Sequence, residues 1–142
     1  MKQKKMHHGI LTIPHLFSLK DILQIVIGAT ILAIPVGFTE ETWRLGESLP
    51  WLNVLGLLLM SVLFIALFVY YNYHRRQKLN KHWGEFLKRV VSTYVFAFIV
   101  VAVILTLIQR TPWATDMALA FKRIIIVTLP STMSAAVADV LR

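Results

Sequence analysis

The stretch that decides the fold is residues 51–71, WLNVLGLLLMSVLFIALFVYY. It is apolar throughout except for Asn53 and Ser61, and aromatic residues stand at both of its ends. A run of about 20 apolar residues is long enough to cross a bilayer as a helix, and aromatic side chains anchor such helices at the membrane interfaces. Residues 51–71 therefore predict a transmembrane helix.

Three further apolar runs follow the same logic, and 57% of the 142 residues are hydrophobic, more than a soluble domain of this size carries. The predicted spans are residues 22–38, 51–71, 90–108 and 123–141. Residues 114–122 are expected to extend the fourth helix beyond the bilayer. The predicted fold is an all-α polytopic membrane protein of about four transmembrane helices, one domain over residues 1–142, assembled as a homo-oligomeric bundle.

The distribution of Lys and Arg predicts the orientation of the spans. The N-terminal tail, residues 1–21, carries four of these residues, the segment 39–50 carries one, and the segment between the second and third spans carries six. Because cytoplasmic segments are enriched in Lys and Arg, both chain ends are expected in the cytoplasm. Arg110, Lys122 and Arg123 do not fit this pattern, since they would lie on the outer side.

Composition excludes several classes of chemistry. The chain has no cysteine, so disulfides and thiolate metal sites are ruled out. The five histidines do not form a ligand set, and no nucleophile motif or glycine-rich phosphate loop is present. The net charge of +8 is explained by residues beside apolar runs, where anionic lipid headgroups attract them. We therefore predict no enzyme activity, no cofactor and no nucleic-acid partner, and leave any metal unassigned.

A stripe of small residues marks one face of the first span. Ala29, Ala33 and Gly37 recur at four-residue spacing. Small residues at this spacing let another helix approach closely. The stripe predicts helix packing, either inside one protomer or around the axis of an oligomer.

The segment Thr39-Glu40-Glu41 places two carboxylates next to a short span. Residues 22–38 would measure about 26 Å as a helix, less than a hydrocarbon core of about 30 Å. In a symmetric oligomer, one acid per chain would form a ring that concentrates cations, and Thr39 could add a ligand. Alternatively, Thr39 caps a short external helix that has Glu40 and Glu41 in its first turn.

Asp139 lies near the inner end of the fourth span, within a run of small residues. Acids in spans are costly and usually have a partner or a function. Asp139 is expected either to neutralise a cytoplasmic Arg or to mark an ion exit.

The chain resembles a family of short prokaryotic multi-pass integral membrane proteins with a domain of unknown function. The resemblance is carried by GAT at residues 28–30 with IPVGFTEETW at residues 34–43, by Phe86 through Arg89 to Tyr94, and by Lys122-Arg123 through Pro130-Ser131 to Asp139. It implies a prokaryotic plasma membrane location and supplies no activity or site residues.

These observations predict a cation-preferring ion channel, or a channel-like pathway, formed by a homo-oligomer. Its partners would be the lipid bilayer, inorganic cations and copies of itself. Glu40, Glu41 and Thr39 would form the outer mouth, with Asp139 as an acid at the inner end. The alternatives are a small proton-coupled secondary transporter and a membrane accessory or scaffold subunit without transport.

Overall fold

A computed structural model describes residues 19–74 and 83–140 of the chain. The helices are α1 (Leu19–Gly37), α2 (Glu40–Ser48), α3 (Trp51–His74), α4 (Trp83–Leu107) and α5 (Met117–Val140). Within these ranges there is no strand, and α1, α3, α4 and α5 are long and apolar enough to cross a membrane. The predicted all-α fold with four spans is confirmed. Residues 1–18 of the predicted tail and residues 75–82 of the predicted basic loop lie outside the described residues.

Three helices begin earlier than their predicted spans: α1 begins at Leu19 rather than at residue 22, and the shifts in α4 and α5 are larger. α4 begins at Trp83 rather than at residue 90, and α5 begins at Met117 rather than at residue 123. Both extensions bring charged residues into the first turns of a helix, where long basic side chains can reach water or a protein partner. The expected extension over residues 114–122 is present as helix from Met117 onward, whereas residues 114–116 belong to the turn before α5.

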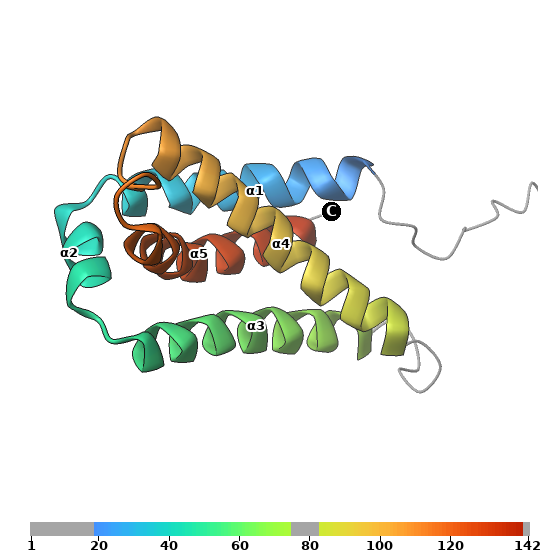
Figure 1. The fold of residues 1–142 in the computed structure, drawn as a ribbon. Coiled ribbons are helices and arrows are strands. Elements are labelled where there is room, and N and C mark those ends of the chain that lie inside the picture. The colour runs from blue at the N-terminus through green and yellow to red at the C-terminus, as the bar shows by residue number, and fades with distance from the viewer. Residues whose placement is uncertain (1–18, 75–82, 141–142) are drawn as a thin grey trace, which may run out of the picture.

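The four spans form a bundle with α5 between α1 and α3 (Figure 1). α3 and α5 run in the same direction, α1 runs in the opposite direction, and α4 crosses them diagonally. We call the end that carries α2 and residues 108–116 the α2 end. The opposite end, where α1 and α4 begin and α3 and α5 finish, is the terminal end.

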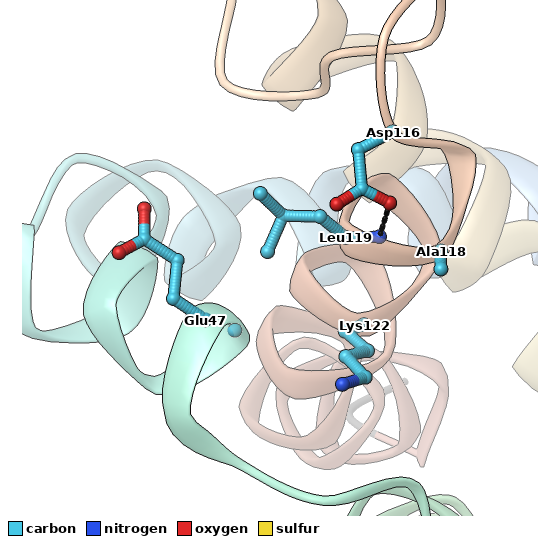
Figure 2. A pocket seen from close by; sticks show the side chains of 6 residues that line it. Glu47, Asp116, Ala118, Leu119 and Lys122 are labelled. Atoms are coloured by element: carbon cyan, nitrogen blue, oxygen red, sulfur yellow. Dashed lines mark hydrogen bonds between the residues drawn. The ribbon is translucent and has the colours of Figure 1, made fainter.

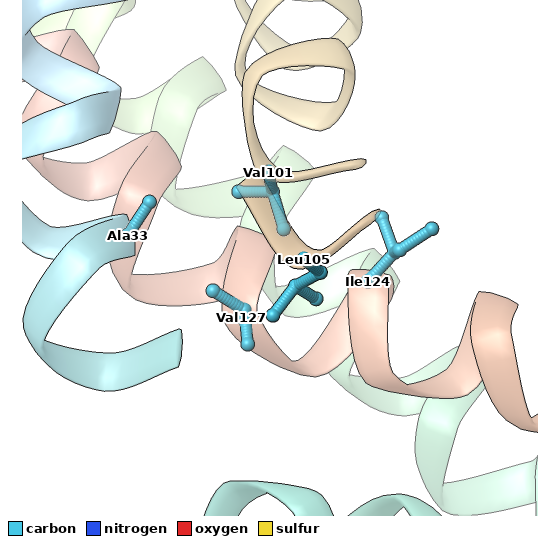
Figure 3. Close-up of a cluster of buried hydrophobic side chains, with 5 residues drawn as sticks. All are labelled: Ala33, Val101, Leu105, Ile124 and Val127. Carbon is cyan, nitrogen blue, oxygen red and sulfur yellow. The ribbon is translucent and has the colours of Figure 1, made fainter. Parts of the chain in front are cut away.

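α5 is the central helix of the bundle. In its apolar window 61% of the residues are buried, against 22–28% in the other three spans. Near the α2 end, α1, α4 and α5 meet in a cluster of Ala33, Val101, Leu105, Ile124 and Val127 (Figure 3). Near the terminal end, α4 packs on α3 through Phe86, Val90, Ile65 and Val69. α4 thus contacts different neighbours at its two ends.

The outward faces of the spans are apolar. On α1 they include Leu23, Ile27 and Ile31, each at least half exposed, and on α3 they include Leu52 and Leu59, at 80% and 67%. Such continuous apolar surfaces are unfavourable in water and are the normal surface of a protein surrounded by lipid. The side of the bundle therefore fits contact with lipid, and polar residues such as Ser61, Thr128 and Asp139 are buried inside it.

The turn between α4 and α5 is fixed by its own backbone. Gln109 has a positive φ of 59°. The amide of Gln109 donates to the carbonyl of Thr106, and the amide of Arg110 donates to that of Leu105. This is the hydrogen-bond pattern of a Schellman motif, which ends α4 and turns the chain back. Asp116 caps the start of α5, since its Oδ1 accepts from the amide of Leu119 at 3.0 Å.

Candidate functional site

The predicted outer-mouth acids lie on the exposed first turn of α2. Glu40 Oε1 accepts from Arg44 Nη2 at 2.6 Å, and both side chains are more than half exposed. Glu41 is exposed on the same turn. A solvated pair of this kind contributes little to stability. In the described parts of the chain, the ion-pair partner of Glu40 is the exposed Arg44, and neither acid lines the pocket beside α2.

Thr39 stands at the N-cap position of α2 without capping it through its side chain. Its hydroxyl donates back to the carbonyl of Val36 at 2.8 Å and lies 2.7 Å from Thr42 Oγ1. The carbonyl of Gly37 instead accepts from the indole of Trp43 at 2.7 Å. Thr39 thus joins the end of α1 to α2.

The small-residue stripe is packed inside this chain. Ala29 and Ala33 are fully buried, in clusters formed with α4 and α5. Gly37 is buried as well, and a Cβ there would lie 3.3 Å from Leu105 Cδ2. The stripe therefore packs against α4 and α5 of the same chain, as one of its two interpretations predicts.

Asp139 forms a buried ion pair with Arg89. Arg89 donates to Asp139 Oδ2 from Nη2 at 2.5 Å and from Nε at 3.1 Å. The side chains are 13% and 4% exposed, for Arg89 and Asp139 respectively. The pair joins the second turn of α4 to the last turn of α5, so Asp139 neutralises an arginine, as one of its two interpretations predicts.

The other oxygen of the carboxylate has no donor. Among the described residues, three buried side-chain atoms lack a hydrogen-bond partner: Gln24 Oε1, Tyr94 Oη and Asp139 Oδ1. They belong to α1, α4 and α5, and each lies in the half of its helix toward the terminal end. Buried acceptors without donors are rare in folded proteins, and each one calls for an explanation such as a bound water or ion.

Close packing of α1 on α5 brings Gln24 to the level of the last turn of α5. A Cβ on Gly28 would lie 2.6 Å from Ala138 Cβ and 2.9 Å from Ala135 Cα, so the two helices touch at this level. Gln24 is one turn from Gly28 toward the terminal end, on the same face of α1. It therefore lies beside the last turn of α5. Asp21, 3% exposed, lies one further turn along.

A second buried cation closes the α2 end. The guanidinium of Arg123 on α5 donates to Glu47 Oε1 at 2.9 Å, to the carbonyl of Trp43 at 3.3 Å and to that of Arg110 at 2.7 Å. Gly46 makes room for it, since a Cβ there would lie 2.6 Å from Arg123 Cγ. Arg123 thereby binds α2 and the turn after α4 to the central helix.

Next to this contact lies a pocket of about 240 Å³ between α2 and the start of α5 (Figure 2). It is lined by Gly46, Glu47, Asp116, Ala118, Leu119 and Lys122. Lys122 Nζ donates to the carbonyl of Leu49 at 3.0 Å and lies 5.1 Å from the centre of the Trp51 ring. The pocket gives solvent access to Glu47, whose side chain is 62% exposed.

The sequence analysis placed Arg89 in a basic loop and Arg123 at the outer end of the fourth span, as an exception to the charge pattern, so it missed the ion pairs that both residues form. The only sequence signal was that each lies within a few residues of an apolar run. Gln24 was also missed, because a single amide in an apolar run does not show which helix it faces. In the described parts of the chain, no group of three or more metal-ligating residues comes together.

The comparison with known families adds the membrane assignment. No curated protein and no solved structure matches the chain. A family described as "Putative integral membrane protein (DUF2391)" matches residues 3–141, nearly the whole chain. This description agrees with the four candidate spans and with the apolar outer surface. The chain therefore belongs to this family of integral membrane proteins, whose domain has no known function.

Proposed function

We propose that this protein transports a proton or a monovalent cation across the membrane, and that Asp139 is the group that binds it. The observation that carries the proposal is the state of the carboxylate: it is buried, one oxygen is bound to Arg89, and the other has no donor. Ionisable groups within membrane spans are costly, and they commonly belong to ion or proton pathways.

The surroundings of Asp139 favour a cation over an anion. The two unpartnered atoms nearest this end of α5, Asp139 Oδ1 and Gln24 Oε1, are both hydrogen-bond acceptors. Acceptors of this kind are satisfied by a proton, by water or by a metal cation. Arg89 holds the carboxylate when the ion is absent, and a proton or cation that binds Asp139 competes with the guanidinium.

The surroundings of the acidic residues favour a transporter over a channel with an acidic mouth. Glu40 is paired with Arg44 on the surface, and Glu41 is solvated. A pore between copies of the chain would place these acids around a symmetry axis, whereas Asp139 needs no second copy to be buried. Self-association and a cytoplasmic location of the terminal end are parts of the proposal that need their own tests.

The test is flux into liposomes that contain the purified protein alone. Proton entry would be followed with an enclosed pH-sensitive dye and Na⁺ or K⁺ entry with ion-selective dyes, which separates the two kinds of ion. We expect the double variant Arg89→Gln/Asp139→Asn to reduce flux to that of protein-free liposomes. It removes both charges, so neither is left buried without its partner.

Glu40→Gln is the matched control, because it breaks an exposed pair and is expected to leave flux unchanged. Full flux in the double variant would refute the role of Asp139. Loss of flux in Glu41→Gln, with the double variant active, would support the acidic pore instead. Absence of flux in the unmodified protein would leave the accessory or scaffold function.

A further inference from the structure

The central helix is held near each of its ends by an arginine–carboxylate pair in which the residue of α5 is buried. Arg123 of α5 pairs with Glu47 of α2 at the α2 end, and Asp139 of α5 pairs with Arg89 of α4 at the terminal end. We propose that these pairs are two gates that open separately, so that the structure with both pairs formed is an occluded state. The inference rests on the proposed cation transport and concerns how the ion reaches Asp139 from each side.

The gate at the α2 end holds together the parts that would have to separate. The Arg123 guanidinium contacts two groups of α2, the Glu47 carboxylate and the carbonyl of Trp43, and one group of the α4–α5 turn, the carbonyl of Arg110. Arg123 is 8% exposed, but Glu47 is largely exposed beside the pocket. Water can therefore solvate Glu47 when the pair breaks, which lowers the cost of opening.

The gate at the terminal end joins α4 to α5 in the part of α4 that packs on α3 and not on α1. Phe86 and Val90 of α4 pack on α3, whereas Ala97 and Val101 pack with residues of α1. Figure 1 shows the resulting diagonal course of α4. An ion that binds Asp139 releases Arg89, and the first turns of α4 then lose their charged contact with α5. Opening at this end leaves the contacts of α4 near the α2 end in place.

A proline lies between the two gates. Pro130 has no amide hydrogen, so the carbonyl of Ile126 lacks its normal helical donor. The neighbouring hydroxyls bond back to their own helix: Thr128 to the carbonyl of Ile124 at 2.6 Å, Ser131 to that of Val127 at 2.9 Å and Thr132 to that of Leu129 at 2.8 Å. Proline and back-bonded hydroxyls both favour bending of a membrane helix. The two halves of α5 can therefore move separately.

The absence of cysteine allows a direct test, because reporter cysteines can be introduced singly with no background. Ala120→Cys and Ala136→Cys report on the two ends of α5, and both alanines are buried, at 0% and 5% exposure. The measurement is the rate at which a water-soluble maleimide labels each reporter in nanodiscs. Labelling needs no transport, so this test can fail independently of the proposed function.

We expect Glu47→Gln to raise labelling at residue 120 by about tenfold, the effect of losing one charge-assisted hydrogen bond, and to leave residue 136 unchanged. The double variant Arg89→Gln/Asp139→Asn is expected to do the reverse. Asp139→Asn alone risks misfolding, which the double variant avoids. Glu40→Gln, on the outside of α2, should change neither rate. Labelling that rises at both ends in one variant, or at neither end, would overturn the two-gate proposal.

Discussion

Gly28 lies where the backbones of α1 and α5 come into close contact. A Cβ there would lie 2.9 Å from both Ala135 Cα and the carbonyl oxygen of Ser134, atoms that cannot move aside as a flexible side chain can. We predict that Gly28→Ala lowers the free energy of unfolding by about 1–3 kcal/mol, as overpacking does. Gly56→Ala is the control, because nothing lies within 4 Å of that Cβ. Unfolding in detergent, followed by circular dichroism, should show the loss only in Gly28→Ala; equal midpoints would contradict this packing.

The two arginine–carboxylate pairs should differ in how much stability the protein loses when one partner is replaced. Asp139→Asn removes the buried carboxylate charge that the Arg89 guanidinium binds, and breaking a pair of this kind typically costs about 3–5 kcal/mol. Arg123→Gln leaves Glu47, which is 62% exposed and can be solvated, so its cost should be smaller. The midpoints of thermal unfolding, measured side by side, check this order. A larger loss in Arg123→Gln would mean that its two carbonyl contacts dominate.

At the scale of elements, α2 depends on contacts made by other helices. It has nine residues, too few to be stable alone, and it is held by Arg123 and by the bond from Trp43 to the carbonyl of Gly37. We predict that Trp43→Phe, which removes that bond and weakens the stacking of Arg110 on the ring, speeds amide exchange across residues 40–48. Hydrogen–deuterium exchange with mass spectrometry measures this. Trp51→Phe serves as the control, and equal protection of α2 in both variants would contradict the prediction.

The helices themselves were largely predictable, because an apolar run such as residues 51–71 is long enough to cross a bilayer as a helix whatever its neighbours are. The start of α4 was not predictable, because adjacent basic residues such as Lys88 and Arg89 are typical of a loop beside a span. Only the structure shows that Arg89 pairs with Asp139, 50 residues away. The same holds for the candidate site. Asp139 could be selected from its position in a span, whereas Gln24 and Arg123 became significant only through their tertiary contacts.

At the scale of the whole molecule, the cations at the two ends of the bundle have different surroundings. At the α2 end, Arg44 is paired with Glu40, Arg110 lies over the ring of Trp43, Lys122 binds the carbonyl of Leu49, and Arg123 is buried. At the terminal end, Arg89 is paired with Asp139, whereas Lys20 and Lys88 are exposed. The three cations that did not fit the charge pattern are thus all in contact with protein groups. Their presence at the α2 end is compatible with a cytoplasmic terminal end.

This arrangement leads to a prediction about orientation. The exposed cations of the terminal end, together with the basic segments of the sequence, should keep that end in the cytoplasm. In intact cells, a membrane-impermeant maleimide should label Ser48→Cys at the α2 end, and should label Gly84→Cys only after permeabilisation. Both positions are exposed, and a Cβ added at Gly84 would meet nothing within 4 Å. The unmodified chain, which has no cysteine, provides the blank. The reverse pattern would place the α2 end in the cytoplasm, and labelling of both positions in intact cells would mean that the chain inserts in two orientations.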